Sequence, residues 1–168
     1  MVRLSKTIMV MAIALFATLV SFGNITDYHT NFEFVRHVLL MDSVFSGSTI
    51  TYRSLHAPWI HHCAYIVIII LETLTAIACW IGAIKMGSAL KRETRAFQAA
   101  KRWAIAGLTL GFLTWQVGFM SIGGEWFGMW MSKQWNGVTN AFQFSITLLA
   151  ILIYITLNND DINNPCLP

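Results

Sequence analysis

Four long apolar stretches follow one another along the chain, and each is long enough to cross a bilayer as a helix. Such a helix needs about 20 mostly apolar residues, and within hydrocarbon it satisfies its own backbone hydrogen bonds. The stretches lack the alternating pattern of membrane β-strands. We therefore predict an all-α polytopic membrane protein, a single domain over residues 1–168 built as a four-transmembrane-helix bundle. Its spans lie at about 7–23, 62–86, 103–122 and 138–157.

The segments between the spans differ in character. In the long first connection, 24–61, apolar residues recur at helical spacing over about 30–45, which predicts an amphipathic helix on the membrane surface or capping the bundle. The connection 87–102 is short and basic. The tail 158–168 is polar and contains two prolines, so we expect it to be disordered.

The distribution of Lys and Arg predicts the orientation. Eight of these residues lie in the N-terminal segment and around the connection 87–102, and three lie on the opposite side. Because cytoplasmic loops carry the excess of positive charge, both termini are expected in the cytoplasm. Arg3 and Lys6 before an apolar run also fit a cleaved signal peptide, but we expect this segment to be retained as the first span.

Composition narrows the class of protein. The chain is 56% hydrophobic and 11% charged, whereas an ordinary soluble domain is about 25% charged. The formal net charge of +3 comes from few charged residues rather than a basic surface, which excludes a nucleic-acid-binding domain. The expected partners are the lipid bilayer and either another membrane protein or further copies of this chain.

Glu72 is the one formal charge in the interiors of the predicted spans, since Lys85 lies at the very end of the second. An ionisable group at that depth costs at least about 2.5–3.5 kcal/mol on insertion scales, so it is usually functional or paired. Helical spacing places His61, Tyr65 and Glu72 on one stripe. Together with Gln116 and Gln143, which lie at comparable depth, they form a candidate intramembrane polar or proton site. The alternative is a protonated carboxyl that is hydrogen-bonded to a neighbouring helix.

Two further patterns concern helix packing. A stripe of polar side chains on the fourth span is expected to bond across helices inside the bundle, or to line a small polar pocket that opens outward. It consists of Asn136, Asn140, Gln143 and Thr147. The spacing Gly107-x-x-x-Gly111, continued by Gly118, predicts close approach of two helices, with packing inside one chain favoured over contact between two copies.

All five histidines lie on the outer side of the predicted membrane. They are His29, His37, His56, His61 and His62. Imidazole binds copper and zinc, but no spacing here matches a zinc signature, so they are weak metal candidates. Haem b would need axial histidines inside the spans. We therefore predict no cofactor.

The stretch 123–130, Gly-Gly-Glu-Trp-Phe-Gly-Met-Trp, followed by Trp135-Asn136-Gly137, resembles the signature of a bacterial family of unknown function described as predicted small integral membrane proteins. Residues 58–83 are similar to that family's second span. The resemblance covers about 5–157 and implies a four-span protein of the bacterial inner membrane. It implies no activity, so no catalytic residue can be transferred.

Within this stretch, Gly123 and Gly124 are expected to end the third helix, and the tryptophans to anchor the next segment at headgroup level. A second candidate site on the outer face combines residues of this turn with two histidines. It consists of Glu125, His62, His56, Trp126 and Trp130. The alternative to a binding site is a rigid aromatic anchor.

Three hypotheses for function follow. The first is a non-catalytic accessory or scaffold subunit of an inner-membrane complex, since the sequence shows no catalytic constellation. The second is a proton-coupled or small-solute carrier that uses Glu72. The third is an outward-facing metal-binding or redox protein that uses the histidines of the first connection.

Overall fold

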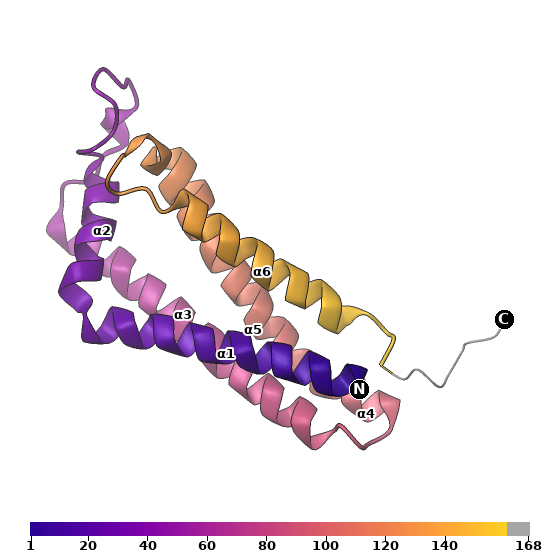
Figure 1. The fold of residues 1–168 in the computed structure, drawn as a ribbon. Coiled ribbons are helices and arrows are strands. Elements are labelled where there is room, and N and C mark those ends of the chain that lie inside the picture. Colours follow the sequence, from indigo (N-terminus) through magenta and orange to yellow (C-terminus); the bar gives the residue numbers. More distant parts are fainter. Residues whose placement is uncertain (161–168) are drawn as a thin grey trace.

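A computed structural model describes residues 1–160 as four long helical segments that pack lengthwise (Figure 1). They are α1 (Val2–Thr26), α3 (Pro58–Ser88), α5 (Arg102–Leu113) with its π-helical continuation η2 (Thr114–Trp126), and α6 (Val138–Thr156). Each of the four is long and apolar enough to cross a membrane. Residues 1–160 contain no β-strand. The predicted fold class, an all-α bundle with four spans, is confirmed.

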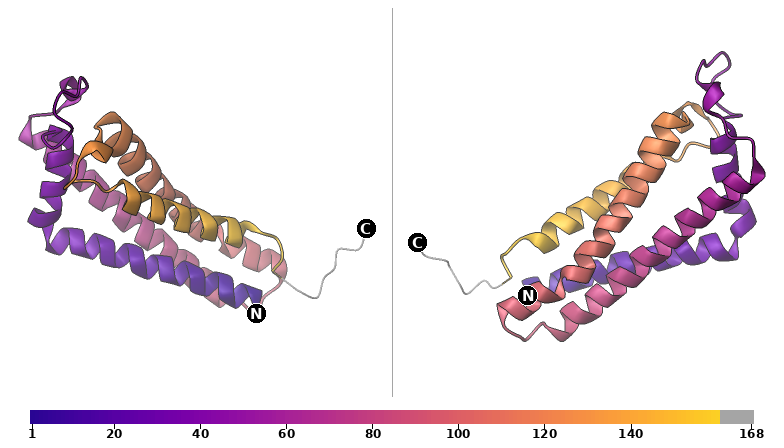
Figure 2. Two further views of the ribbon diagram at one scale, coloured as in Figure 1. Left: turned by 45° about the horizontal axis from the view of Figure 1, so that its top comes forward. Right: turned by 180° about the vertical axis from the view of Figure 1, so that it is seen from behind.

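The bundle has two unlike ends (Figures 1 and 2). At one end α2 (Tyr28–Leu40) and two short 3-10 helices, η1 (Thr51–Arg53) and η3 (Met129–Met131), lie over the ends of the long helices. This is called the α2 end below. At the opposite end, called the terminal end, the N-terminus lies beside α4 (Thr94–Ala100).

The helix α2 is the predicted amphipathic helix. Its apolar face is buried, with Phe32, Val35 and Leu39 among the residues it contributes to the core of the α2 end. The helix is shorter than predicted because Met41 takes a left-handed conformation, with φ 54°, directly after it. Phe45 therefore lies outside the helix, where it is exposed and its ring contacts Trp130 edge-on.

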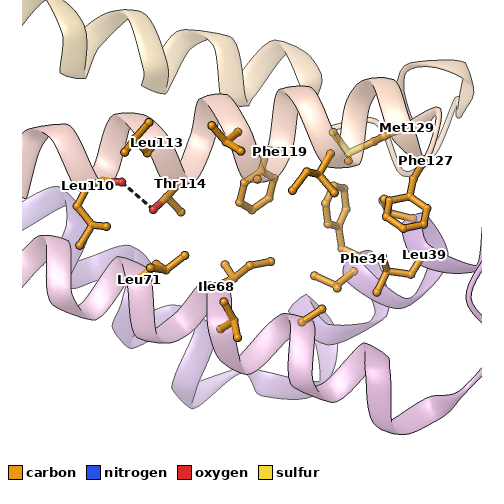
Figure 3. A pocket seen from close by; sticks show the side chains of 18 residues that line it. Phe34, Leu39, Ile68, Leu71, Leu110, Leu113, Thr114, Phe119, Phe127 and Met129 are labelled. Atoms are coloured by element: carbon orange, nitrogen blue, oxygen red, sulfur yellow. Dashed lines mark hydrogen bonds between the residues drawn. The ribbon is translucent and has the colours of Figure 1, made fainter.

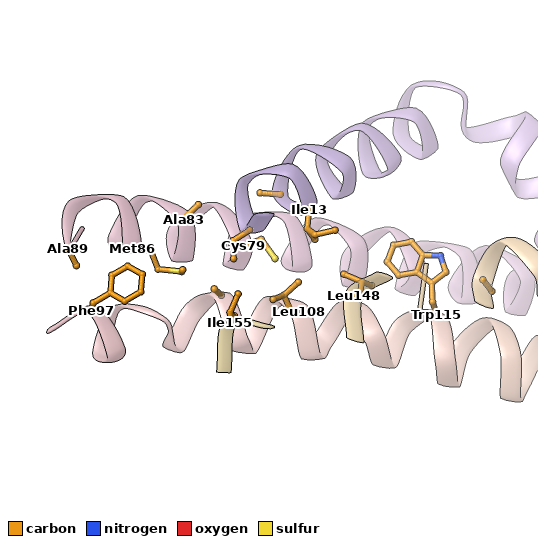
Figure 4. Packing of buried hydrophobic residues seen from close by; sticks show 14 residues of the cluster. Ile13, Cys79, Ala83, Met86, Ala89, Phe97, Leu108, Trp115, Leu148 and Ile155 are labelled. Carbon is orange, nitrogen blue, oxygen red and sulfur yellow. The ribbon is translucent and has the colours of Figure 1, made fainter. Parts of the chain in front are cut away.

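The close approach predicted from the glycine spacing occurs between α3 and α5. A Cβ atom on Gly82 would lie 2.4 Å from the backbone nitrogen of Ala104, and one on Gly107 would lie 2.7 Å from the sulfur of Cys79. Only glycine permits this backbone separation. Around the contact, side chains of all four long segments form the main apolar core (Figure 4).

We predicted that the third span ends at Gly123 and Gly124, but it does not. The helix continues through both to Trp126 as a π-helix, and the chain reverses at Gly128, whose φ of +65° favours glycine. A Cβ on Gly124 would lie 3.4 Å from Val138 of α6. The two glycines therefore serve packing against the neighbouring segments rather than a turn.

The polar stripe of α6 points away from the core, contrary to prediction. Asn140, Gln143 and Thr147 are all exposed, and the buried face of α6 is formed instead by small and apolar residues such as Ala141, Ser145 and Leu148. The apolar side chains of α6 are numerous enough to cover both faces, so the sequence pattern alone did not identify the inner one.

The terminal end is closed by buried charges. The ammonium group of Lys6 lies 2.7 Å from Oδ1 of Asp160, and that of Lys101 lies 2.7 Å from Oδ2 of the same carboxylate. The three residues are 0%, 1% and 4% exposed. Lys6 also donates to the carbonyl of Leu157. Within the tail that was predicted to be disordered, two lysines bind Asp160, and residues 161–168 lie outside the described part.

Candidate functional site

A cavity lies between α3 and η2, at the end of the bundle that α2 covers (Figure 3). Its volume is about 480 Å³. Ile68 and Leu71 of α3 face Leu113 and Phe119 of the opposite helix across it. We call this cavity the lateral pocket.

The lateral pocket exists because two helices that touch at one end separate at the other. Gly111 of α5 still lies close to α3, since its Cβ would be 3.0 Å from a methyl carbon of Thr75. At Gly118, seven residues further along, no atom of the described residues would lie within 4 Å of a Cβ. The divergence between these two glycines leaves the space that Gly118 lines.

The lining of the lateral pocket is almost entirely apolar. Thr114 is the one hydroxyl among its described lining residues, and it donates to the carbonyl of Leu110 at 2.9 Å, within its own helix. No polar group is therefore available to bind a polar ligand inside. The pocket is suited to a hydrocarbon occupant.

The pocket opens sideways, between the two helices that form it. Val67 on α3 and Leu113, Val117 and Ile122 on the opposite helix belong to the lining and are also exposed. Exposed apolar side chains on membrane-spanning helices face lipid. At the α2 end, Phe34, Leu39, Phe127 and Met129 close the pocket (Figure 3). The opening therefore faces the bilayer interior rather than water.

Glu72 and Tyr65, the core of the predicted intramembrane site, are both bonded to Asn24 of α1. The side-chain amide of Asn24 donates to the Glu72 carboxyl at 2.6 Å, and the Tyr65 hydroxyl donates to the Asn24 carbonyl at 3.0 Å. Both Glu72 and Tyr65 are 2% exposed. Asn24 was not selected from the sequence. The signal that could have identified it is its position as a polar amide at the end of the first apolar stretch.

The same helix pair carries further polar contacts. Ser21 and Thr73 share a hydrogen bond of 2.6 Å, and the indole of Trp80 donates to Thr18 at 3.0 Å. With the Asn24 bonds they form a row of hydrogen bonds between α1 and α3. This arrangement matches the interpretation of Glu72 as a hydrogen-bonding group between helices.

The other members of the predicted intramembrane site lie apart from this row. His61 is buried, and its Nε2 donates to the carbonyl of Leu55 at 2.7 Å, which fixes the loop before α3. Gln116 is half-buried on η2 and Gln143 is exposed on α6. Among residues 1–160, no hydrogen bond joins either glutamine side chain to Glu72.

The predicted outer-face site is divided between two places. His56 and His62 share a shallow hollow of about 310 Å³ with His61 at the start of α3. His62 stacks on Phe32, with ring centroids 4.2 Å apart. Glu125 is exposed at the end of η2.

The two tryptophans of that site contact residues of the first connection instead. The guanidinium of Arg53 lies over the indole of Trp126, 4.6 Å from its centroid, and donates to its carbonyl. Trp130 contacts Phe45.

The histidines do not assemble into a metal centre in the part of the chain that the structure describes: no three His, Cys, Asp or Glu side chains there are grouped to hold an ion. His37 lies between Asp42, at 2.7 Å, and Glu33, at 3.5 Å, and stacks on Trp135. His29 is exposed on α2. These contacts connect α2 to its neighbours.

We expect Glu72→Gln to change the free energy of unfolding by less than about 1 kcal/mol, because the new carboxamide still accepts from Asn24. Glu72→Leu removes the acceptor and leaves the half-buried amide nitrogen of Asn24 without its partner, which costs about 1–3 kcal/mol. Thermal unfolding in mild detergent measures both. Equal losses in the two variants would contradict a purely hydrogen-bonding role.

Four helices long and apolar enough to cross a membrane, joined by a row of interhelical hydrogen bonds, define a polytopic integral membrane protein. A family model described as "Predicted small integral membrane protein (DUF2165)" matches residues 2–158. The chain belongs to this family, as the tryptophan- and glycine-rich signature indicated. No curated protein and no solved structure shows significant similarity to the chain.

Proposed function

We propose that the protein is a non-catalytic accessory protein of the membrane that binds a hydrocarbon chain of a membrane lipid in the lateral pocket. The observation that carries this proposal is the pocket itself, which is apolar throughout its interior and open towards the bilayer. A lipid chain is the most abundant apolar ligand at that depth.

The dimensions of the pocket favour a hydrocarbon chain over a helix. A helix with its side chains is about 10–12 Å across, so two turns of it would need at least about 800 Å³. The pocket has a volume of about 480 Å³. A methylene chain fits, since carbon atoms pack at about 3.5–4.0 Å.

An accessory role in a larger complex agrees with the surface of α6. Asn140 and Gln143 are exposed, and neither side chain has a hydrogen-bond partner among residues 1–160. In lipid alone, amides near the hydrocarbon would lose hydrogen bonds, and a polar helix of another membrane protein would restore them. The excess of Lys and Arg at the terminal end supports an inner-membrane protein with both termini in the cytoplasm.

A carrier that uses Glu72 has less support. The carboxyl is bonded to Asn24 within the α1–α3 contact, and it does not line the lateral pocket. A metal-binding role would need the histidines to converge, and they are distributed over α2 and the start of α3.

Replacing Gly118 with leucine is expected to displace the lipid chain without disturbing the fold. The new side chain enters the pocket, where a Cβ meets no described atom within 4 Å. The matched control is Gly23→Leu, because Gly23 on α1 has the same free space but does not line the pocket. Native mass spectrometry of protein extracted in mild detergent measures the retained lipid.

We expect at least about a tenfold loss of bound lipid in Gly118→Leu and no loss in Gly23→Leu, since filling the pocket removes the whole apolar contact of the chain. Thermal unfolding of each variant is the check that both remain folded. Equal lipid retention in the two folded variants would contradict the proposal.

A further inference from the structure

We propose that the lateral pocket selects a lipid with a phosphate headgroup, and that Arg53 binds this phosphate at the α2 end. The inference rests on the proposed function, because it requires a lipid chain in the pocket. It adds the chemical class of the ligand and a binding residue outside the apolar lining.

The position of Arg53 follows from its contact with Trp126. Its Nη1 donates to the Trp126 carbonyl at 3.2 Å, and its guanidinium lies 4.6 Å from the indole centroid. Ile122, at the rim of the pocket, precedes Trp126 by one turn of the same helix, and both side chains are exposed. Phe127, the next residue, lines the pocket. Arg53 therefore lies about one helical turn beyond the opening of the lateral pocket, towards the α2 end of the bundle.

Arg53 has hydrogen-bonding capacity left for a ligand. A guanidinium has five N–H groups, and those of Arg53 make one bond to Trp126 and one to the Tyr52 hydroxyl. Three N–H groups have no partner among residues 1–160. Arginine matches phosphate geometry with paired hydrogen bonds. Tryptophan at the same level is typical of the headgroup region.

The other charges of the α2 end differ from Arg53. Arg36 is paired with Glu33 at 2.7 Å on the exposed face of α2. Glu125 is adjacent to Trp126 in sequence and exposed, and it forms no ion pair with Arg53 in the described part of the chain. Lys133 is exposed beyond η3. Among the described cations here, Arg53 alone combines proximity to the opening with unused donors.

The test compares two lipids with the same acyl chains. Dioleoyl phosphatidylglycerol carries a phosphate and dioleoylglycerol does not. Native mass spectrometry measures the binding of each to purified full-length protein in non-ionic detergent. The variants are Arg53→Gln and, as the control, Arg36→Gln, which removes an arginine of the same end that does not line the lateral pocket.

We expect wild-type protein to bind the phospholipid about tenfold more tightly than dioleoylglycerol, as a hydrogen bond to a charged group provides. Arg53→Gln should abolish this preference and leave dioleoylglycerol binding unchanged, whereas Arg36→Gln should keep it. Inorganic phosphate alone should not bind, because the chain supplies the apolar contact.

Each alternative result has a distinct meaning. Equal binding of the two lipids to wild-type protein overturns the phosphate site and leaves the hydrocarbon pocket intact. Loss of both lipids in Arg53→Gln also overturns it, because the arginine would then act only by holding η1 against η2. If neither lipid binds the wild-type protein, the proposed function itself fails.

Discussion

Replacing Gly82 with alanine is expected to lower the free energy of unfolding by about 2–3 kcal/mol, the upper part of the range of about 1–3 kcal/mol for overpacking a core. The added methyl would lie 2.4 Å from the nitrogen and 2.6 Å from the Cα of Ala104. Both are backbone atoms, so no side-chain rotation can relieve the overlap. The α3 and α5 helices would have to move apart along the whole contact that Gly107 continues.

The matched control is Gly118→Ala on the same continuous helix as α5. No described atom would lie within 4 Å of its Cβ, and alanine is favoured over glycine inside a helix by about 0.5–1 kcal/mol. We therefore expect this variant to be as stable as the wild type or slightly more so. Thermal unfolding in one detergent compares the two. Similar destabilisation at Gly82 and Gly118 would mean that the α3–α5 contact does not limit stability.

Replacing Asp160 with asparagine removes its charge and is expected to lower the free energy of unfolding by about 3–5 kcal/mol, the range for removing one partner of a buried ion pair. The carboxylate lies between Lys6 and Lys101, which are 0% and 1% exposed, and it also accepts from Gln98. Without it, two buried ammonium groups face each other with no compensating charge among residues 1–160. The asparagine keeps the size of the side chain, so the loss measures the charge.

The control is Glu93→Gln, which removes an exposed acid at the same end that makes no cap hydrogen bond to α4. We expect a change of less than about 0.5 kcal/mol there. The double variant Asp160→Asn with Lys101→Met should recover part of the loss, because it removes one uncompensated charge. A neutral effect of Asp160→Asn alone would contradict a buried ion cluster.

The spans and the amphipathic helix could be predicted because each depends on a pattern within one short segment. Phe32, Val35 and Leu39 recur at helical spacing, and all three are buried in α2. Likewise, the spacing of Gly107 and Gly111 indicated a close helix contact without naming the partner, which the structure identifies as α3.

What the sequence did not predict depends on segments far apart in the chain. The lateral pocket arises from the angle between α3 and η2, and no local pattern encodes that angle. Asp160 appeared to belong to a free tail because its lysines lie in α1 and directly after α4. On α6, apolar residues surround the helix, so the outward direction of Gln143 depended on which neighbours pack against it.

The bond between Lys6 and Asp160 joins residues that are 154 positions apart in the chain. Synthesis proceeds from the N-terminus, so α1 enters the membrane long before its ionic partner has been made. Contacts of such long sequence separation form late in folding. The N-terminal end of α1 therefore gains its ionic partner last, and the terminal end closes only after translation has passed the end of α6.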